Sequence, residues 1–157
     1  MCIKLQIINI CSFLLILYTY FNIITKHSNV FLDSKLAKFE LCSGHRIFIR
    51  KIKEKPGITR DSFKHIAHVH PSNITRAIDY LEEKGFIIKE LKEEDKRICL
   101  LYPTEKLDEV YRVLIEAEKE WTDIITKGLN EEQLEIYNKF LLLSTELSAN
   151  YIHNKNE

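Results

Sequence analysis

Four polar side chains follow a proline in the segment PSNITR: Ser72, Asn73, Thr75 and Arg76. An Asn side chain can form paired hydrogen bonds with adenine, and an Arg side chain can do so with guanine. Ser and Thr hydroxyls commonly bind phosphate groups and fix the register of a protein on a duplex. These residues therefore predict contacts with double-stranded DNA. The alternative is an ordinary solvated start of a helix.

The helix that would carry these residues is predicted to begin at His70-Pro71-Ser72. Proline suits the first helical position because its missing N–H would have no partner there. Apolar residues then recur at helical spacing, and Gly85 is expected to end the helix. Tyr80 and Lys84, near that end, are candidates for further phosphate contacts.

A shorter helix is predicted directly before it. Ile58 is a single apolar residue, so at most a very short strand is expected there. Thr59 is a good N-cap for a helix that begins with Arg60-Asp61-Ser62. Two helices joined by a tight turn, the second with a polar N-terminal end, form a helix-turn-helix.

A β-hairpin is predicted after the second of these helices. Residues 86–91 (FIIKEL) and 98–102 (ICLLY) are typical of strands, and the charged segment 92–97 (KEEDKR) is typical of the turn between them. A hairpin in this position is a wing. The predicted fold class is thus mainly α with a small β-hairpin wing.

Helices are also predicted on both sides of this unit. A long first helix is expected to end near Lys38, and Thr104 is expected to cap a long helix that Lys127-Gly128 ends. Asn130 then caps the last helix, and Gln133 three residues later completes a pair that resembles a capping box.

The distribution of charge favours the same interpretation. The formal net charge is zero, yet residues 44–102 hold 13 Lys/Arg against 9 Asp/Glu, whereas residues 103–157 hold 6 against 12. A basic middle beside an acidic C-terminal part suggests that one segment meets phosphate and another meets protein. A length of 157 residues fits one ordinary domain.

The segment from Leu5 to Ile24 contains 20 residues without a charge. That length could span a bilayer. However, polar residues such as Gln6 and Asn9 are scattered along it at roughly helical spacing. We therefore favour a helix buried in a dimer core, with a membrane anchor as the alternative.

Metal-binding and catalytic chemistry have less support. His65, His68 and His70 are closely spaced, but no carboxylate completes a ligand set, so we predict a surface cluster and no metal site. No Gly-rich phosphate loop, nucleophile elbow or carboxylate pair in an identifiable pocket is present, so we predict no enzyme and no cofactor.

Two cysteines are candidates for a redox site. Cys42 stands where the N-terminus of the second helix is expected, and such a position stabilises the thiolate that reacts with peroxide. Cys11 competes with it, and an unreactive cap or core cysteine is the alternative for either residue. Cys99, on the second wing strand, is expected to pack against the interior.

From about Phe31 to Tyr151 the sequence resembles the MarR (multiple antibiotic resistance regulator) family of transcription regulators. The resemblance is carried by PGITRDSFKHIAHVHPSNITRAIDYLEEKGFI and EEDKRICLLYPT, followed by a capped helix and KGLNEEQ. Three features depart from the family pattern: Lys64 stands where Ala is usual, Pro103 directly precedes the helix cap, and the first 24 residues are unusually apolar.

The resemblance implies a homodimer in which the first and last helices intertwine. It divides the single domain 1–157 into a DNA-binding part, 41–104, and a helical dimerisation part, 1–40 and 105–157. It places Ser72, Asn73, Thr75 and Arg76 in the major groove. It also implies that Arg97 reaches the minor groove and that Asp95 braces the wing.

In the family a regulatory ligand binds between the dimer helices and the winged domain. The residues of this chain that would line such a pocket are aromatic or His side chains: Tyr18, Phe21, His45, Phe48, Tyr111 and Trp121. Aromatic residues at helical spacing also serve simply as core. The family includes peroxide sensors with a reactive Cys near the N-terminus, which bears on Cys11.

We therefore expect a cytoplasmic, homodimeric repressor that binds a palindromic operator and is released by a small-molecule or redox signal. One alternative is a winged-helix protein-interaction module without an operator of its own. Another is a membrane-tethered regulator. Salt-sensitive binding to palindromic DNA distinguishes the first alternative, and the need for detergent distinguishes the second.

Overall fold

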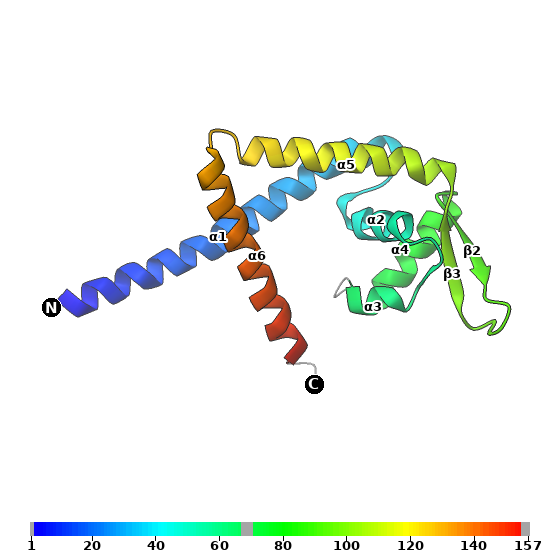
Figure 1. The fold of residues 1–157 in the computed structure, drawn as a ribbon, viewed down its shortest axis with the longest axis horizontal. Helices are drawn as coiled ribbons and strands as arrows, with labels where there is room; N and C mark the ends of the chain where they lie inside the picture. Colours follow the sequence, from blue (N-terminus) through cyan, green and yellow to red (C-terminus); the bar gives the residue numbers. More distant parts are fainter. Residues whose placement is uncertain (1, 67–70, 155–157) are drawn as a thin grey trace. The chain divides into compact units, whose positions relative to one another are not determined.

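The computed structural model describes residues 2–66 and 71–154, with side chains described for 15–64, 71–152 and 154 (Figure 1). The chain divides into two compact units, Met1–Lys119 and Glu120–Glu157. The elements in chain order are α1 (Cys2–Leu36), η1 (Ala37–Phe39), η2 (Ser43–His45), α2 (Arg46–Glu54), β1 (Ile58–Thr59), α3 (Ser62–Ile66), α4 (Pro71–Glu83), β2 (Ile87–Leu91), β3 (Cys99–Pro103), α5 (Glu105–Ile125) and α6 (Glu131–Asn154).

The three strands form one antiparallel sheet in the order β1-β3-β2, so the second wing strand lies in the middle. Leu101 pairs with Ile58 on one side and with Lys89 on the other. The backbone N–H of Gly57 extends this ladder by donating to the Leu101 carbonyl at 2.8 Å. Gly57 has φ +81°, and a Cβ there would lie 3.3 Å from the Tyr102 hydroxyl oxygen, so both conformation and space favour glycine. The predicted wing is confirmed, and β1 ties it to the helix-turn-helix.

A single apolar core holds the first unit together. Phe63 of α3 is fully buried, and its ring packs on Phe48 of α2 with centroids 4.9 Å apart. Every element of this unit that has described side chains, apart from the two short 3-10 turns, contributes to the cluster. Its members are Leu32, Leu36, Leu41, Phe48, Ile49, Ile52, Ile58, Phe63, Ile74, Ile78, Leu81, Phe86, Ile87, Leu101, Leu107, Val110, Leu114 and Ala117. Cys99 packs against the cluster, as expected from its place in the strand.

Two local predictions need correction. Helix α3 begins at Ser62 and not at Arg60, although the Thr59 hydroxyl accepts from the Ser62 N–H at 3.3 Å as a capping side chain does. Thr104 precedes α5 as predicted, but its hydroxyl lies 2.8 Å from the Gly85 carbonyl and 2.9 Å from that of Phe86. The side chain of Thr104 therefore joins the end of the α4–β2 turn to α5 and does not cap the helix.

The second unit consists of the end of α5 and the helix α6. Its capping box is present: Gln133 N–H donates to Asn130 Oδ1 at 2.9 Å, and Asn130 N–H donates to Gln133 Oε1 at 3.0 Å. Much of the apolar surface of α6 is exposed in the single chain. The exposed residues are Ile136, Phe140, Leu142, Leu143, Leu147, Tyr151 and Ile152.

Residues 15–24 of α1 are similarly apolar and exposed. The side chains concerned are Leu15, Ile16, Leu17, Tyr18, Tyr20, Phe21, Ile23 and Ile24. Within the described residues, no helix combines the length and apolar character that crossing a membrane requires.

Candidate nucleic-acid interface

The first turns of α4 present the four predicted polar side chains away from the core. Ser72, Asn73 and Arg76 are exposed, and Thr75 is partly buried with its hydroxyl donating to the Pro71 carbonyl at 3.3 Å. The opposite side of the helix carries Ile74, Ile78 and Leu81, all buried. Burial of that apolar side determines which side of α4 faces outward.

The turn of the wing is held by its own backbone and by Asp95. The Asp95 carboxylate accepts from the Arg97 N–H at 3.0 Å, and the Asp95 carbonyl accepts from the Ile98 N–H at 2.9 Å. The Lys92 N–H closes the turn on the Ile98 carbonyl at 2.9 Å. The carboxylate thus fixes the backbone from which the Arg97 side chain starts, and the bracing of the wing by Asp95 stays a prediction.

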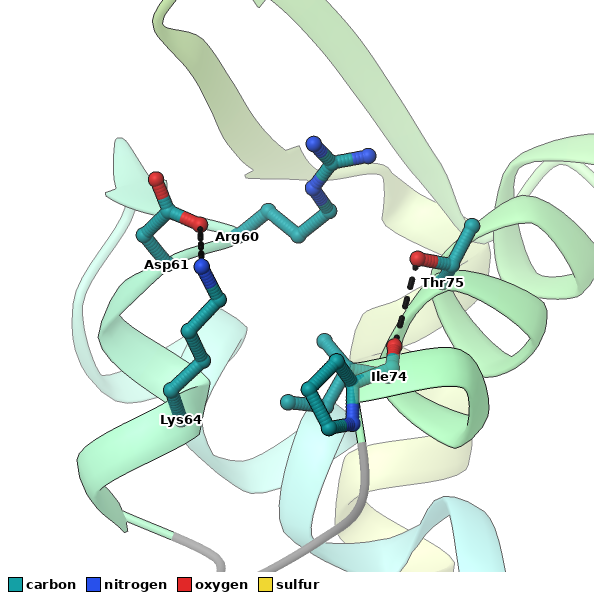
Figure 2. A pocket seen from close by; sticks show the side chains of 6 residues that line it. Arg60, Asp61, Lys64, Ile74 and Thr75 are labelled. Atoms are coloured by element: carbon teal, nitrogen blue, oxygen red, sulfur yellow. Dashed lines mark hydrogen bonds and ion pairs between the residues drawn. The ribbon is translucent and has the colours of Figure 1, made fainter.

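Two cavities lie beside these elements. The first, about 170 Å³, is lined by Arg60, Asp61, Lys64, Pro71, Ile74 and Thr75, and so opens between α3 and the start of α4. Figure 2 shows the Arg60 side chain extending into the space between the α3 side and Thr75. The second, about 140 Å³, is lined by Thr59, Arg60, Asp61, Arg97, Ile98 and Cys99. Two basic side chains and one acidic side chain line each cavity.

Ion pairing divides the basic residues into two groups. Many cations are neutralised within the chain: Arg50 by Glu118, Lys53 by Asp108, Lys64 by Asp61, Lys84 by Glu40, Lys89 by Asp79 and Glu82, and Lys92 by Glu94. By contrast, Arg60, Arg76 and Arg97 have no acidic partner among the residues that the structure describes. A guanidinium without a carboxylate retains its charge for another anion.

Tyr80 and Lys84 are both engaged with Glu40. The Tyr80 hydroxyl donates to the Glu40 carbonyl at 2.7 Å, and the Lys84 ammonium binds the Glu40 carboxylate. The hydrogen bond from Lys84 and the charge of Lys84 lower the pKa of the Glu40 carboxyl. Glu40 itself has φ 60°, the left-handed conformation that turns the chain out of η1. These two side chains therefore fasten the end of α4 to the segment after α1.

Cys42 and His45 form a second local cluster. The Cys42 N–H donates to His45 Nδ1 at 3.2 Å, and Cys42 Sγ lies 3.3 Å from the same nitrogen. The His45 ring stacks on Tyr80 with centroids 5.2 Å apart. Burial of the imidazole lowers the pKa of His45. His45 is thus neutral at pH 7, and Nδ1 acts as an acceptor.

The six residues predicted to line an effector pocket belong to both units, so their common role stays a prediction. Tyr18 and Phe21 are exposed on α1, Phe48 is a core residue with 2% of its surface exposed, and Tyr111 packs against the core from α5. His45 has the contacts given above, and Trp121 belongs to the second unit. None of the six lines either cavity.

Other predicted residues fall outside the described side chains. These are Cys11 and the His65, His68 and His70 cluster. Among the described residues, no group of three or more His, Cys, Asp or Glu is arranged to hold a metal ion.

Arg60 lines both cavities, yet the sequence indicated only a helix start there. The sequence did hold a clue to Arg60. An Arg directly after a capping Thr, at the start of a helix-turn-helix, is a cation near the predicted interface. Its proximity to Arg97 depends on the pairing of β1 with β3, which sequence patterns did not specify.

This arrangement, a helix-turn-helix followed by a hairpin that is tied back to it, defines a winged-helix DNA-binding fold. The MarR family model matches residues 48–99. The chain is 32% identical over 102 residues to the HTH-type transcriptional regulator YybA of Bacillus subtilis (strain 168), a match that covers 65% of this chain and 68% of the relative. The chain belongs to the MarR family and is a transcription regulator.

Solved structures agree over most of the chain. A MarR protein from Peptoclostridium difficile superposes with a TM-score of 0.80 at 27% identity, covering 86% of this chain and 88% of that one. A MarR family transcriptional regulator from Listeria monocytogenes, solved in complex with a 26mer DNA, superposes with a TM-score of 0.75 at 24% identity, covering 85% and 89%. At that identity the second likeness concerns the fold alone.

Proposed function

We propose that this chain is a homodimeric repressor that binds a palindromic operator with α4 in the major groove and the wing in the minor groove. The observation that carries the proposal is the pattern of ion pairing. Arg76 on α4 and Arg97 on the wing keep their charges free, whereas most neighbouring cations are neutralised within the chain. The Listeria protein of the same fold was solved in complex with a 26mer DNA, which is consistent with DNA binding by this fold.

The four α4 residues have distinct roles in this proposal. Asn73 and Arg76 read base edges, and Ser72 and Thr75 hold phosphates. Arg97 enters the minor groove, and Asp95 holds the turn that presents it. Residues 41–104 are the DNA-binding part of the domain.

The dimer is supported by the apolar side chains of α1 and α6, within 1–40 and 105–157. Each of these helices exposes a run of large apolar side chains, whereas a monomer usually exposes such residues singly. Mutual burial of these helices in two copies would remove them from water. It would also set the distance between two recognition helices, which must match half-sites about one helical turn, ~34 Å, apart.

Release by a signal completes the proposal, and one candidate is oxidation of Cys42. Its thiol is exposed and lies against the neutral His45 ring, which can accept the thiol proton. The thiolate would then attack a peroxide, taking one oxygen as sulfenic acid while the other leaves as water. The alternative signal is a small molecule bound near Tyr18, Phe21, His45, Phe48, Tyr111 and Trp121.

The test is to select DNA from a random pool with the purified protein and to titrate the selected duplex with salt. We expect a palindrome and a steep loss of affinity with salt, because cations that replace counterions make binding salt-dependent. Arg76→Ala should relax preference at one position per half-site, at a cost of about 1–3 kcal/mol. An unchanged ratio between the best and worst sequences would contradict base reading by Arg76. A chain that selects no DNA would instead favour a protein-interaction module.

The same duplex tests the signal. Peroxide should abolish binding by the wild type and spare Cys42→Ser, with Cys99→Ser as the matched control. If Cys42→Ser is equally sensitive, Cys42 is not the sensor.

A further inference from the structure

Arg60 lies between the two elements proposed to enter DNA. The cavity on one side of it reaches Thr75 on α4, and the cavity on the other side reaches Arg97 at the wing. Arg60 and Asp61 are the residues that these two cavities share. Arg60 is therefore adjacent to both the recognition helix and the wing.

The backbone of Arg60 is firmly held, although its side chain is exposed. The preceding residue, Thr59, pairs with Leu100 in the sheet. The Arg60 carbonyl accepts from the N–H of Phe63 at 3.2 Å, and Phe63 is fully buried. An arginine that starts from such an anchored point loses less freedom on binding than one on a mobile loop.

The charge of Arg60 is not paired with a carboxylate among the described residues. The neighbouring carboxylate, Asp61, binds the Lys64 ammonium at 2.8 Å (Figure 2). That ion pair leaves the guanidinium as the uncompensated charge of the first cavity. In the second cavity Arg97 adds another.

The geometry of duplex DNA then decides what Arg60 faces. The major and minor grooves of B-DNA are separated by a strand of phosphates, so a protein with a helix in one groove and a wing in the next straddles that strand. We propose that Arg60 binds the phosphates of this strand, between the base-reading helix and the wing. The inference rests on the proposed DNA-binding function and adds a contact to it.

The guanidinium is well matched to this task. Its planar donors can bind two phosphate oxygens at once, whereas an ammonium acts as a point charge. A phosphate contact carries no sequence information, so its loss should weaken binding to all sequences alike. It should also lower the number of counterions released.

The experiment measures the salt dependence of affinity for the selected palindrome and for an unrelated duplex of equal length. Compared with the wild type, Arg60→Ala should bind both duplexes about tenfold more weakly at low salt. It should reduce the slope of log affinity against log salt by about 1 per half-site contact. Arg60→Lys should keep the slope and recover part of the affinity.

Arg112→Ala is the charge-matched control, because Arg112 is exposed on α5 and lines neither cavity. It should change neither affinity nor slope. Since Arg60 is exposed, its variants should keep the wild-type melting temperature, which circular dichroism checks.

The outcomes are separable. If the wild type shows no salt-dependent binding to either duplex, the proposed function fails. If the wild type binds and Arg60→Ala keeps both affinity and slope, the role of Arg60 is overturned while the function stands. Loss on the palindrome alone would mean that Arg60 reads bases, and equal losses in Arg112→Ala would mean a general effect of charge. Either result also overturns the phosphate role.

Discussion

The winged part of the chain, 41–104, and the apolar surfaces of α1 and α6 use hydrophobic residues in opposite ways. In the winged part, side chains such as Phe63 and Leu101 belong to the core cluster and are fully buried. On α1 and α6, side chains such as Tyr18 and Phe140 are 71% and 66% exposed. The first region is complete within one chain. In the second region, contact of so much apolar surface with water is unfavourable, which is why we propose that a second copy covers it.

The largest effect should come from the centre of the first region. Phe63→Ala removes a buried ring that packs on Phe48, and should lower the free energy of unfolding by about 3–5 kcal/mol. Chemical denaturation at fixed protein concentration measures this. Leu91→Ala, at an apolar residue 61% exposed on β2, is the control and should stay within about 0.5 kcal/mol of the wild type. Equal losses would mean that burial does not distinguish the two sites.

A substitution in the second region should change the dimer dissociation constant. Phe140→Asp places a charge where two copies are proposed to meet, and an unpaired charge is costly to bury. We expect the dimer dissociation constant to rise at least about tenfold, which corresponds to about 1.4 kcal/mol. Sedimentation velocity across a concentration series measures it. Leu91→Asp introduces the same charge on the wing and should leave the dimer dissociation constant unaltered. A wild type that is monomeric at micromolar concentration would contradict the proposed dimer.

A wing variant should change DNA binding without changing either stability or assembly. Arg97→Ala should weaken binding by about 1–3 kcal/mol, and more so on operators with A·T-rich flanks, because a narrow minor groove concentrates negative potential. Lys at this position should recover only part of the loss. Asp95→Asn should act more weakly in the same direction, since the carboxylate holds only the turn. Fluorescence anisotropy on the two flank types measures this. Equal losses on both would identify a plain phosphate contact.

The smallest effect concerns His45, near the start of the winged part. Burial lowers the pKa of His45 in the folded chain, so the unfolded chain takes up the proton first as pH falls. Stability present above the ordinary His value of about 6.5 is therefore lost below it. His45→Gln keeps an acceptor for the Cys42 N–H and should lose less stability between pH 7 and pH 5. Parallel denaturation curves for both proteins over this range would rule the effect out.

The local architecture could be predicted because its signals lie close together in the sequence. Pro71, Gly85 and the Asn130–Gln133 pair each act over a few residues, and the structure places helix ends at or beside them. The outward-facing polar positions on α4, which we propose to contact DNA, also followed from residue type and spacing along one helix.

Contacts between distant residues could not be predicted in this way. The Thr104 hydroxyl turns to the carbonyls of Gly85 and Phe86, and Tyr80 and Lys84 reach Glu40. Each depends on how elements pack in three dimensions, which periodicity does not encode. For the same reason, the placement of Arg60 beside the wing emerged only from the pairing of β1 with β3.

The central position of β3 has an evolutionary consequence. Its residues are bonded on both sides, so the base of the wing is bound to the core, whereas residues 92–97 interact mainly among themselves and with water. Substitutions in that turn cost little folding energy, and they alter the part of the wing that extends furthest from the core. On the proposed mode of binding, a lineage can therefore change its operator preference by substitution in residues 92–97 without disturbing the sheet beneath them.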